Sequence, residues 1–168
     1  MRAQTPGRRV SRPLAIVAMI AAMAIVAISG RSAFGDASHA GWPDTSGRLK
    51  MHKRDRDGVL RGSHRSDELL GGHGHDVILG RGSGDVIWGD YKPCCQPTSQ
   101  HDVLVSGPGR DFTYASHGHN RIDAGPGNDV VHAHFGRGRV DCGSGHDVLY
   151  VSHRSRRVYR IRHCERIR

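Results

Sequence analysis

The sequence has few of the residues on which large cores and many enzymes depend. Of its 168 residues only 5% are aromatic, and only two, Glu68 and Glu165, are Glu, against fourteen Asp. A large aromatic core is therefore not expected. The chain has no His-Glu-x-x-His zinc-protease motif, no Gly-x-Ser-x-Gly nucleophile elbow and no Walker A phosphate loop. These absences remove three familiar catalytic or nucleotide-binding classes, and we expect no enzyme activity.

Residues 1–35 have the layout of a secretory signal peptide. A basic start without acidic residues precedes an uninterrupted apolar run at 14–28, and Ala33-Phe34-Gly35 is the expected cleavage site. The run is shorter than the ~20 residues that a membrane-spanning helix needs. We therefore expect a secreted, extracellular protein without a stable membrane span, with an uncleaved signal anchor as the alternative.

The positive charge is concentrated at the two ends of the chain. The formal net charge is +9, but residues 1–35 hold five of the 25 basic residues and none of the 16 acidic ones. The remainder carries 20 basic and 16 acidic side chains, and seven of its Arg lie in residues 154–168. The middle of the chain is thus close to balanced, and no nucleic-acid partner is expected.

A nine-residue repeat occupies residues 62–150 and is interrupted once. Gly-Gly-His-Gly-His-Asp-Val-Ile-Leu begins at Gly71, and Gly-Arg-Gly-Ser-Gly-Asp-Val-Ile-Trp begins at Gly80. Position six of the successive copies is Asp67, Asp76, Asp85, Asp102, Asp111, Asn120, Asp129, Gly138 and Asp147. Position eight is aliphatic in every copy but one: Leu69, Ile78, Ile87, Leu104, Thr113, Ile122, Val131, Val140 and Leu149.

Each half of the repeat favours a different local structure. The glycine-rich half favours a tight turn, because glycine tolerates positive φ. The other half favours a three-residue strand whose central side chain points inward. Two repeats then form an eighteen-residue coil, and stacked coils bury one column of aliphatic side chains on each side. The predicted fold class is all-β: a right-handed parallel β-roll, which is a β-solenoid of nine-residue half-coils.

This pattern resembles the Gly-Gly-x-Gly-x-Asp-x-U-x nonapeptide of RTX-type (hemolysin-type) calcium-binding β-rolls. The resemblance implies Ca²⁺ between successive turns on the same side of the roll, with position-six carboxylates and turn carbonyls as ligands. Oxygen ligands suit Ca²⁺, and closely spaced Asp side chains repel one another without it. Folding driven by calcium follows, because the oxygen cage does not exist in the unfolded chain.

Turns on the same side of the roll are two repeats apart, so the Asp residues separate into two rows. Asp85 and Asp102 are seventeen residues apart instead of nine, which we interpret as a loop inserted at 91–100. Row one then contains Asp67, Asp85, Asp111, Asp129 and Asp147, and row two contains Asp76, Asp102, Asn120 and Gly138. The alternative is that these Asp only form turns.

The predicted calcium ligands are ranked by the quality of their turns. The best sites pair Asp111 with Asp129 and Asp129 with Asp147; pairs Asp85/Asp111 and Asp76/Asp102 come next, and Asn120 and Gly138 break the pattern. The glycines expected to shape the turns are Gly71, Gly72, Gly74, Gly107, Gly109, Gly125, Gly127, Gly143 and Gly145.

The end of the chain is similar to the C-terminal unit of secreted actinobacterial members of this family, in Val-Asp-Cys-Gly-Ser-Gly at 140–145 and Cys-Glu-Arg-Ile at 164–167. The likeness implies a Cys142–Cys164 disulfide that holds residues 151–168 as a basic cap over the open end of the roll. A tail that binds nucleic acid or an anionic surface is the alternative. Cys94 and Cys95 are expected to pair with each other or with a group outside the chain.

Histidines form a second candidate site. His75, His101 and His119 occupy position five of row two, so that their imidazoles fall about 4.8 Å apart on neighbouring coils. Such a column suits Zn²⁺ or Ni²⁺, whereas ordinary exposed histidines are the simpler interpretation. Residues 36–61 indicate a linker or N-terminal cap. The leading hypothesis is an exported Ca²⁺-binding protein without catalysis, and the alternative is a cell-surface adhesin or envelope-binding module.

Overall fold

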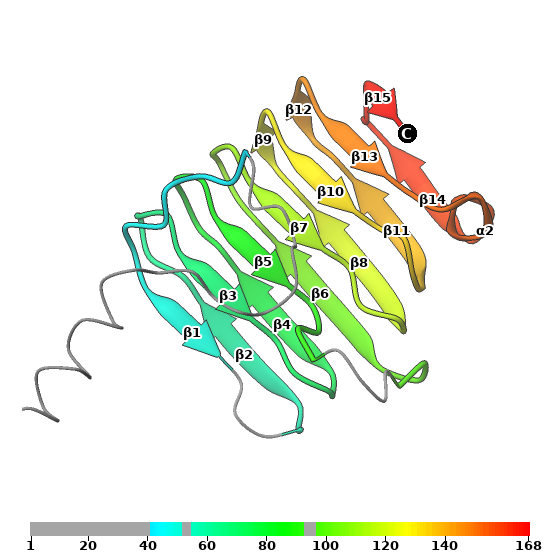
Figure 1. Ribbon diagram of the computed structural model, residues 1–168, viewed down its shortest axis with the longest axis horizontal. Helices are drawn as coiled ribbons and strands as arrows, with labels where there is room; N and C mark the ends of the chain where they lie inside the picture. Colours follow the sequence, from blue (N-terminus) through cyan, green and yellow to red (C-terminus); the bar gives the residue numbers. More distant parts are fainter. Residues whose placement is uncertain (1–40, 52–54, 93–96) are drawn as a thin grey trace, which may run out of the picture. The chain divides into compact units, whose positions relative to one another are not determined.

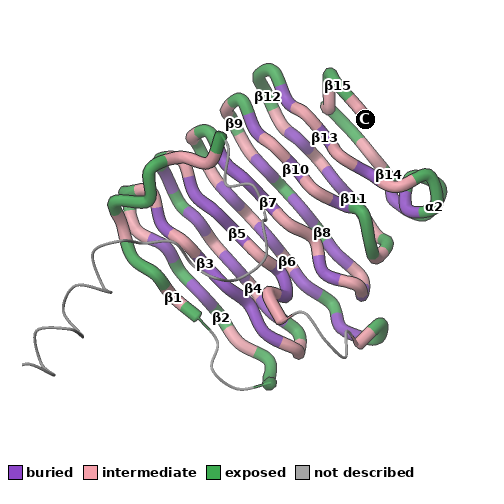
Figure 2. The backbone as a smooth tube through the Cα atoms, viewed as in Figure 1, coloured by how far each residue is buried: buried purple, intermediate pink, exposed green. Residues whose placement is uncertain are grey.

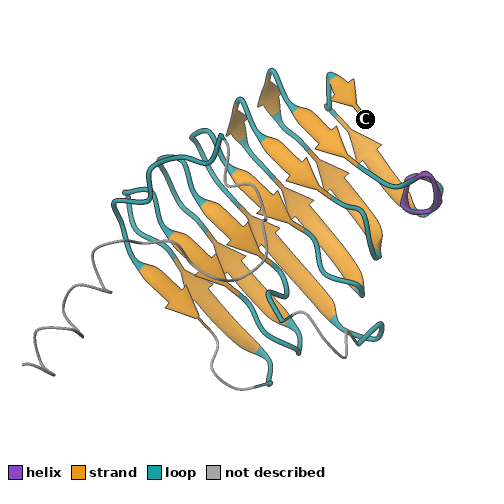
Figure 3. Ribbon diagram, viewed as in Figure 1, coloured by secondary structure: helices purple, strands orange, loops and turns teal. Residues whose placement is uncertain are grey.

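The computed structural model describes residues 41–51, 55–92 and 97–168. The predicted leader and the Cys94–Cys95 pair lie outside these residues. Within them, the chain winds through short parallel strands in two main sheets, and this all-β solenoid matches the predicted fold class (Figures 1 and 3). None of the described helices has the length and apolar character needed to cross a bilayer.

The strands alternate between the two sheets along the sequence. The seven-stranded sheet contains, in spatial order, β1 (Leu49–Met51), β3 (Glu68–Leu70), β5 (Val86–Trp88), β7 (Phe112–Tyr114), β10 (Val130–His132), β13 (Val148–Tyr150) and β15 (Arg166–Ile167). The six-stranded sheet contains β14 (Tyr159–Arg162), β11 (Arg137–Asp141), β8 (His119–Asp123), β6 (His101–Val105), β4 (Asp76–Leu79) and β2 (Gly58–Arg61). In the turns, β9 (Pro126–Gly127) pairs with β12 (Ser144–Gly145).

The register of the sheets follows the repeat. Val131 lies opposite Leu149, and Ile122 lies opposite Val140, so equal repeat positions face each other on successive coils. The register continues across the longer connection between β5 and β6, because β4 still pairs with β6 and β5 with β7. The extra residues therefore leave the coil as a loop and do not shift the side chains between faces.

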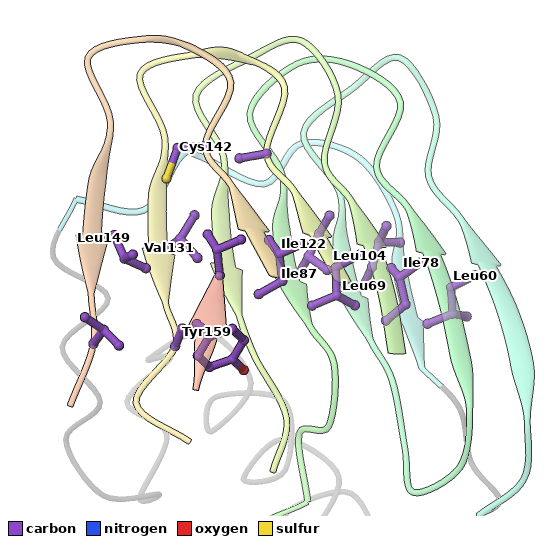
Figure 4. Close-up of a cluster of buried hydrophobic side chains, with 14 residues drawn as sticks. Leu60, Leu69, Ile78, Ile87, Leu104, Ile122, Val131, Cys142, Leu149 and Tyr159 are labelled. Carbon is purple, nitrogen blue, oxygen red and sulfur yellow. The ribbon is translucent and has the colours of Figure 1, made fainter. Parts of the chain in front are cut away.

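The core is a narrow double column of position-eight side chains (Figures 2 and 4). Leu69, Ile87, Val131 and Leu149 come from one sheet and Ile78, Leu104, Ile122 and Val140 from the other, and all are at most 1% exposed. Thr113 replaces an aliphatic residue in this column, and its hydroxyl is paired with that of Ser106 at 2.8 Å. The alternation of buried and exposed residues along each strand follows from the two-residue period of a strand.

Both ends of the roll are formed by residues outside the clearest repeats. On the N-terminal side β1 and β2 already pair with β3 and β4, so the sheets extend to the N-terminal side of residue 62. On the C-terminal side α2 (His153–Arg156), capped by Ser152, leads into β14 and β15. The predicted Cys142–Cys164 disulfide is present, with the two Cα atoms 5.1 Å apart. It ties the last complete coil to this terminal segment.

Candidate metal centre

The row-one carboxylates form a continuous ladder along one edge of the roll. The N–H of each residue donates to the Oδ1 of the next Asp along the row: Asp67 to Asp85 at 2.7 Å, Asp85 to Asp111 at 2.6 Å, Asp111 to Asp129 at 2.9 Å and Asp129 to Asp147 at 2.8 Å. The strands on each coil fix this spacing, because position six directly precedes a strand of the seven-stranded sheet. One oxygen of each acceptor carboxylate is thus used by the protein.

The second oxygen of four row-one carboxylates has no hydrogen-bond partner. The Oδ2 atoms of Asp85, Asp111, Asp129 and Asp147 are buried and unpaired, and these residues are at most 1% exposed. Each unsatisfied buried group of this kind costs about 1–3 kcal/mol. A column of such atoms in neighbouring coils is a strong sign that a ligand outside the polypeptide completes their bonding.

Burial also changes the acidity of these carboxyl groups. It raises the pKa of Asp111 to about 8, and those of Asp85 and Asp129 to about 7, with the neighbouring carboxylates adding to the increase. The pKa of Asp147 is raised as well, again mainly by burial. Near neutral pH the row therefore resists ionisation unless positive charge is supplied.

Glycines let the turns of row one stack closely enough to present backbone oxygen. A Cβ on Gly145 would lie 1.5 Å from the carbonyl oxygen of Gly127, and a Cβ on Gly127 would lie 1.7 Å from that of Gly109. Gly145 and Gly109 also have φ values of +145° and +153°. Any side chain there would displace the neighbouring carbonyl, so these turns are lined by main-chain oxygen.

The turn before Asp85 departs from this arrangement. Arg81 and Ser83 have φ values of +88° and +70°, in positions where the later turns carry glycine. Non-glycine residues are strained in this region, at a cost of roughly 1–2 kcal/mol each. The turns that precede Asp111, Asp129 and Asp147 contain no such residue.

At both ends of row one, hydrogen bonds from other parts of the protein complete the ladder. Both oxygens of Asp67 accept hydrogen bonds, Oδ1 from the N–H of Arg48 and Oδ2 from that of Ser63. Burial alone would raise the pKa of Asp67, but these donors hold it below its usual value. At the other end, Glu165 accepts the N–H of Asp147 at 2.8 Å. Sequence reasoning missed Glu165, although it lies one eighteen-residue coil after Asp147.

Row two has a different chemistry. The N–H of Asp76 donates to the Oδ1 of Asp102 at 3.0 Å, and the other Asp102 oxygen accepts from the Ser116 hydroxyl. In the next coil the Asn120 amide donates to the Ser116 carbonyl and to the Tyr159 hydroxyl, both at 2.9 Å. Side-chain amide and hydroxyl groups therefore occupy the position that carboxylates fill in row one.

The predicted histidine column is assembled as a stack of rings. The ring centroids of His75 and His101 are 5.1 Å apart, and those of His101 and His119 are 4.7 Å apart with planes only 7° from parallel. The Nδ1 of His75 accepts the N–H of His101, and the Nε2 of His119 accepts from Arg137. Among the described residues, no three His, Cys, Asp or Glu side chains converge as a metal-binding group.

The ligands that row one offers are oxygen atoms, which suit a hard cation, but its side chains alone are too few to surround the ion. Each candidate site offers two carboxylates, and the other ligands have to come from the turn carbonyls described above. Ca²⁺ accepts six to eight such oxygens in flexible geometry, whereas Zn²⁺ and Ni²⁺ favour nitrogen or sulfur. The parallel solenoid and its carboxylate ladder thus define a calcium-binding β-roll.

The comparison with protein families agrees with this class. The model of the RTX calcium-binding nonapeptide repeat (4 copies) matches residues 57–90, 98–131 and 114–149, which together are about half of the chain. The chain belongs to this family, whose repeats bind Ca²⁺. No curated protein and no solved structure matches it.

Proposed function

We propose that the protein is exported, that it binds Ca²⁺ between successive row-one turns, and that calcium binding drives the roll to fold. The observation that carries the proposal is the column of four buried Oδ2 atoms without partners in row one. Their ionised forms would repel one another along the column, and a divalent cation between each pair removes both the repulsion and the unsatisfied oxygen.

The proposed sites lie between neighbouring carboxylates of row one. Asp111 with Asp129, and Asp129 with Asp147, hold the two strongest sites, since glycine shapes both turns. Asp85 with Asp111 holds a weaker one because of the strained Arg81 and Ser83. In row two, Asp76 with Asp102 is the last candidate, because Asp102 already uses both oxygens in the protein.

Export and the absence of catalysis belong to the same proposal. Proteins with these repeats are typically secreted, and the order of basic, apolar and small residues in 1–35 is that of a signal peptide. Scarce cytosolic calcium would leave the chain loosely folded, and abundant extracellular calcium would close the roll. The repeats occupy most of the chain outside the leader, and the sequence lacks the three catalytic or phosphate-binding motifs considered above.

The direct test is a calcium titration of the exported chain after metal stripping, followed by far-ultraviolet circular dichroism, with Mg²⁺ and Zn²⁺ as comparison ions. Ca²⁺ alone should produce β-structure. Asp129→Asn should weaken calcium binding by roughly tenfold or more, because it removes one charge from two sites. The matched variant Asp102→Asn in row two should change it far less.

Three results would contradict the proposal. They are a metal-free chain that is already fully folded, equal effects of the two Asn variants, and folding induced by Zn²⁺ instead of Ca²⁺. The last result would favour the histidine column as the metal site.

A further inference from the structure

The outer face of the six-stranded sheet carries an ordered group of basic side chains. Neighbouring strands β6, β8, β11 and β14 lie side by side in register (Figure 1). Arg121 lies opposite Arg139, and Arg139 lies opposite Arg160. We call the surface formed by these residues, Arg137, His101 and His119 the arginine face.

The charges of this face are largely uncompensated within the molecule. Arg139 forms an ion pair with Asp141 at 2.8 Å. None of the other three arginines is in an ion pair with any carboxylate of the described ranges, and Arg137 donates instead to His119 at 2.5 Å. Like charges on neighbouring strands, about 4.8 Å apart, destabilise a sheet. An anionic ligand would remove this repulsion.

The face is also hollowed. A shallow depression of about 670 Å³ extends over all four strands, with Val103 and Gly138 among the residues that line it between the basic side chains. Asp123 and Asp141 lie opposite each other at the far ends of β8 and β11. The two oxygens of Asp141 are already paired with Arg139 and His163. The surface thus offers a row of cations beside Asp123, an acceptor suited to a hydroxyl group.

We propose that the arginine face binds a linear acidic polysaccharide, a chain of sugars that carry carboxylates, laid across the strands. A guanidinium group pairs with a carboxylate through two parallel hydrogen bonds. The spacing between strands is close to the advance of one sugar ring in an extended polysaccharide. Carboxylates on alternate sugars of the chain therefore meet Arg121 and Arg160, which lie two strands apart. Asp123 then accepts a hydrogen bond from a sugar hydroxyl group.

Other polyanions fit the surface less well. Single-stranded nucleic acid is held by aromatic side chains on which bases stack. No Phe, Tyr or Trp lines the depression, and its two imidazoles, His101 and His119, are already stacked on each other. A lipid surface requires apolar side chains that insert below the headgroups, and Val158 is the only lining residue among the exposed large hydrophobics of the described chain.

The test measures binding of a fluorescently labelled hyaluronan decasaccharide to the full exported chain in the presence of Ca²⁺, with circular dichroism as the check of folding. The double variant Arg121→Gln, Arg160→Gln removes two exposed arginines without a polar partner in the described structure. The matched control Arg65→Gln, Arg156→Gln removes the same charge at exposed positions outside this face.

We expect hyaluronan to bind, its affinity to fall at high salt, and the first variant to bind roughly tenfold more weakly while the control binds as the parent does. A neutral maltodextrin of equal length should not bind. The proposal is overturned if hyaluronan fails to bind the folded protein or if both variants lose affinity equally. It is also overturned if a single-stranded oligonucleotide or an anionic vesicle binds this face more tightly than hyaluronan does.

Discussion

Row one and row two are built from the same nine-residue repeat, but their buried polar atoms are satisfied in different ways. In row one, four carboxylates each keep one buried oxygen without a partner. In row two, the Ser116 hydroxyl, the Asn120 amide and the Tyr159 hydroxyl form a hydrogen-bonded network with Asp102. This solenoid therefore stacks its polar turns in two ways: with unpaired carboxylate oxygens, between which we propose a cation, or with an internal hydrogen-bonded network.

The largest expected difference between the rows is in the pH dependence of the metal-free protein. The pKa values of Asp85, Asp111 and Asp129 are raised to about 7–8 by burial, so the folded state binds more protons than the unfolded state above pH ~4. The contribution of these three groups to the free energy of unfolding should then be greatest at low pH and fall as the pH rises through 7–8. Far-ultraviolet circular dichroism of the metal-free chain at pH values of about 5 and 8 checks this, because β-structure should be retained at the lower pH and lost at the higher one.

One variant in each row tests which of the two rows causes this pH dependence. Asp111→Asn should remove a larger share of it than Asp102→Asn, because the pKa of Asp102 is raised only to about 6. With saturating Ca²⁺ the trend should reverse, since binding requires ionised carboxylates. Metal-free stability that increases from pH ~5 to pH ~8 would contradict the view that row one is buried without compensation.

The next largest effect concerns the end of row one. Replacing both cysteines of the Cys142–Cys164 disulfide by Ala should lower the free energy of unfolding by about 3 kcal/mol, because the bond closes a loop of 22 residues. Urea denaturation in excess Ca²⁺ measures this. Cys94→Ala with Cys95→Ala is the control for loss of cysteine, and an equal loss in both variants would refute a specific role for the cap.

A smaller effect is expected in row two. Asn120→Asp removes the amide donor to Ser116 and Tyr159 and places a second carboxylate near Asp102, which should cost about 2 kcal/mol of stability. The same change at Asn128 is the control, because its exposed Oδ1 accepts from His146 and remains an acceptor in Asp. Thermal unfolding of the two variants compares them, and equal midpoints would show that the row-two network does not stabilise the roll.

The smallest effect is expected at Glu165. Glu165→Ala removes the acceptor of the Asp147 N–H and should cost about 1 kcal/mol in an unfolding experiment in excess Ca²⁺. Glu165→Gln retains an acceptor and should be nearly neutral. A loss of calcium binding in the Gln variant would instead make Glu165 a calcium ligand and not only the end of the ladder.

Much of the fold follows from the period of the sequence. Position eight predicted the core residues from Leu69 to Leu149, because a two-residue alternation within a strand leaves one inward side chain in each half-coil. The two rows also follow from counting once eight residues near Tyr91–Gln100 are assigned to a loop. The hydrogen bonds from Asp76 to Asp102 and from Asp85 to Asp111 join residues on opposite sides of that loop.

Other features lie outside what the repeat motif predicts, since they depend on residues at its variable positions or beyond its last glycine turn. Glu165 ends a full eighteen-residue coil that lacks the glycine turn, and Tyr159 reaches Asn120 from a strand 39 residues later. The arginine face is also invisible in the repeat, because its members occupy variable, outward positions. The repeat relates Arg121 to Arg139, but only strand register shows that Arg160 lies beside them.

The sequence by itself determined the solenoid, its core columns and the identity of the calcium family, because these depend on local alternation and on glycine at fixed positions. The tertiary structure decided which polar atoms are left without partners and which charges are placed together. These properties depend on the neighbouring coils that each residue meets, eighteen or more residues away in the chain. Burial and pairing are therefore results of stacking, and stacking is set only when all coils are in place.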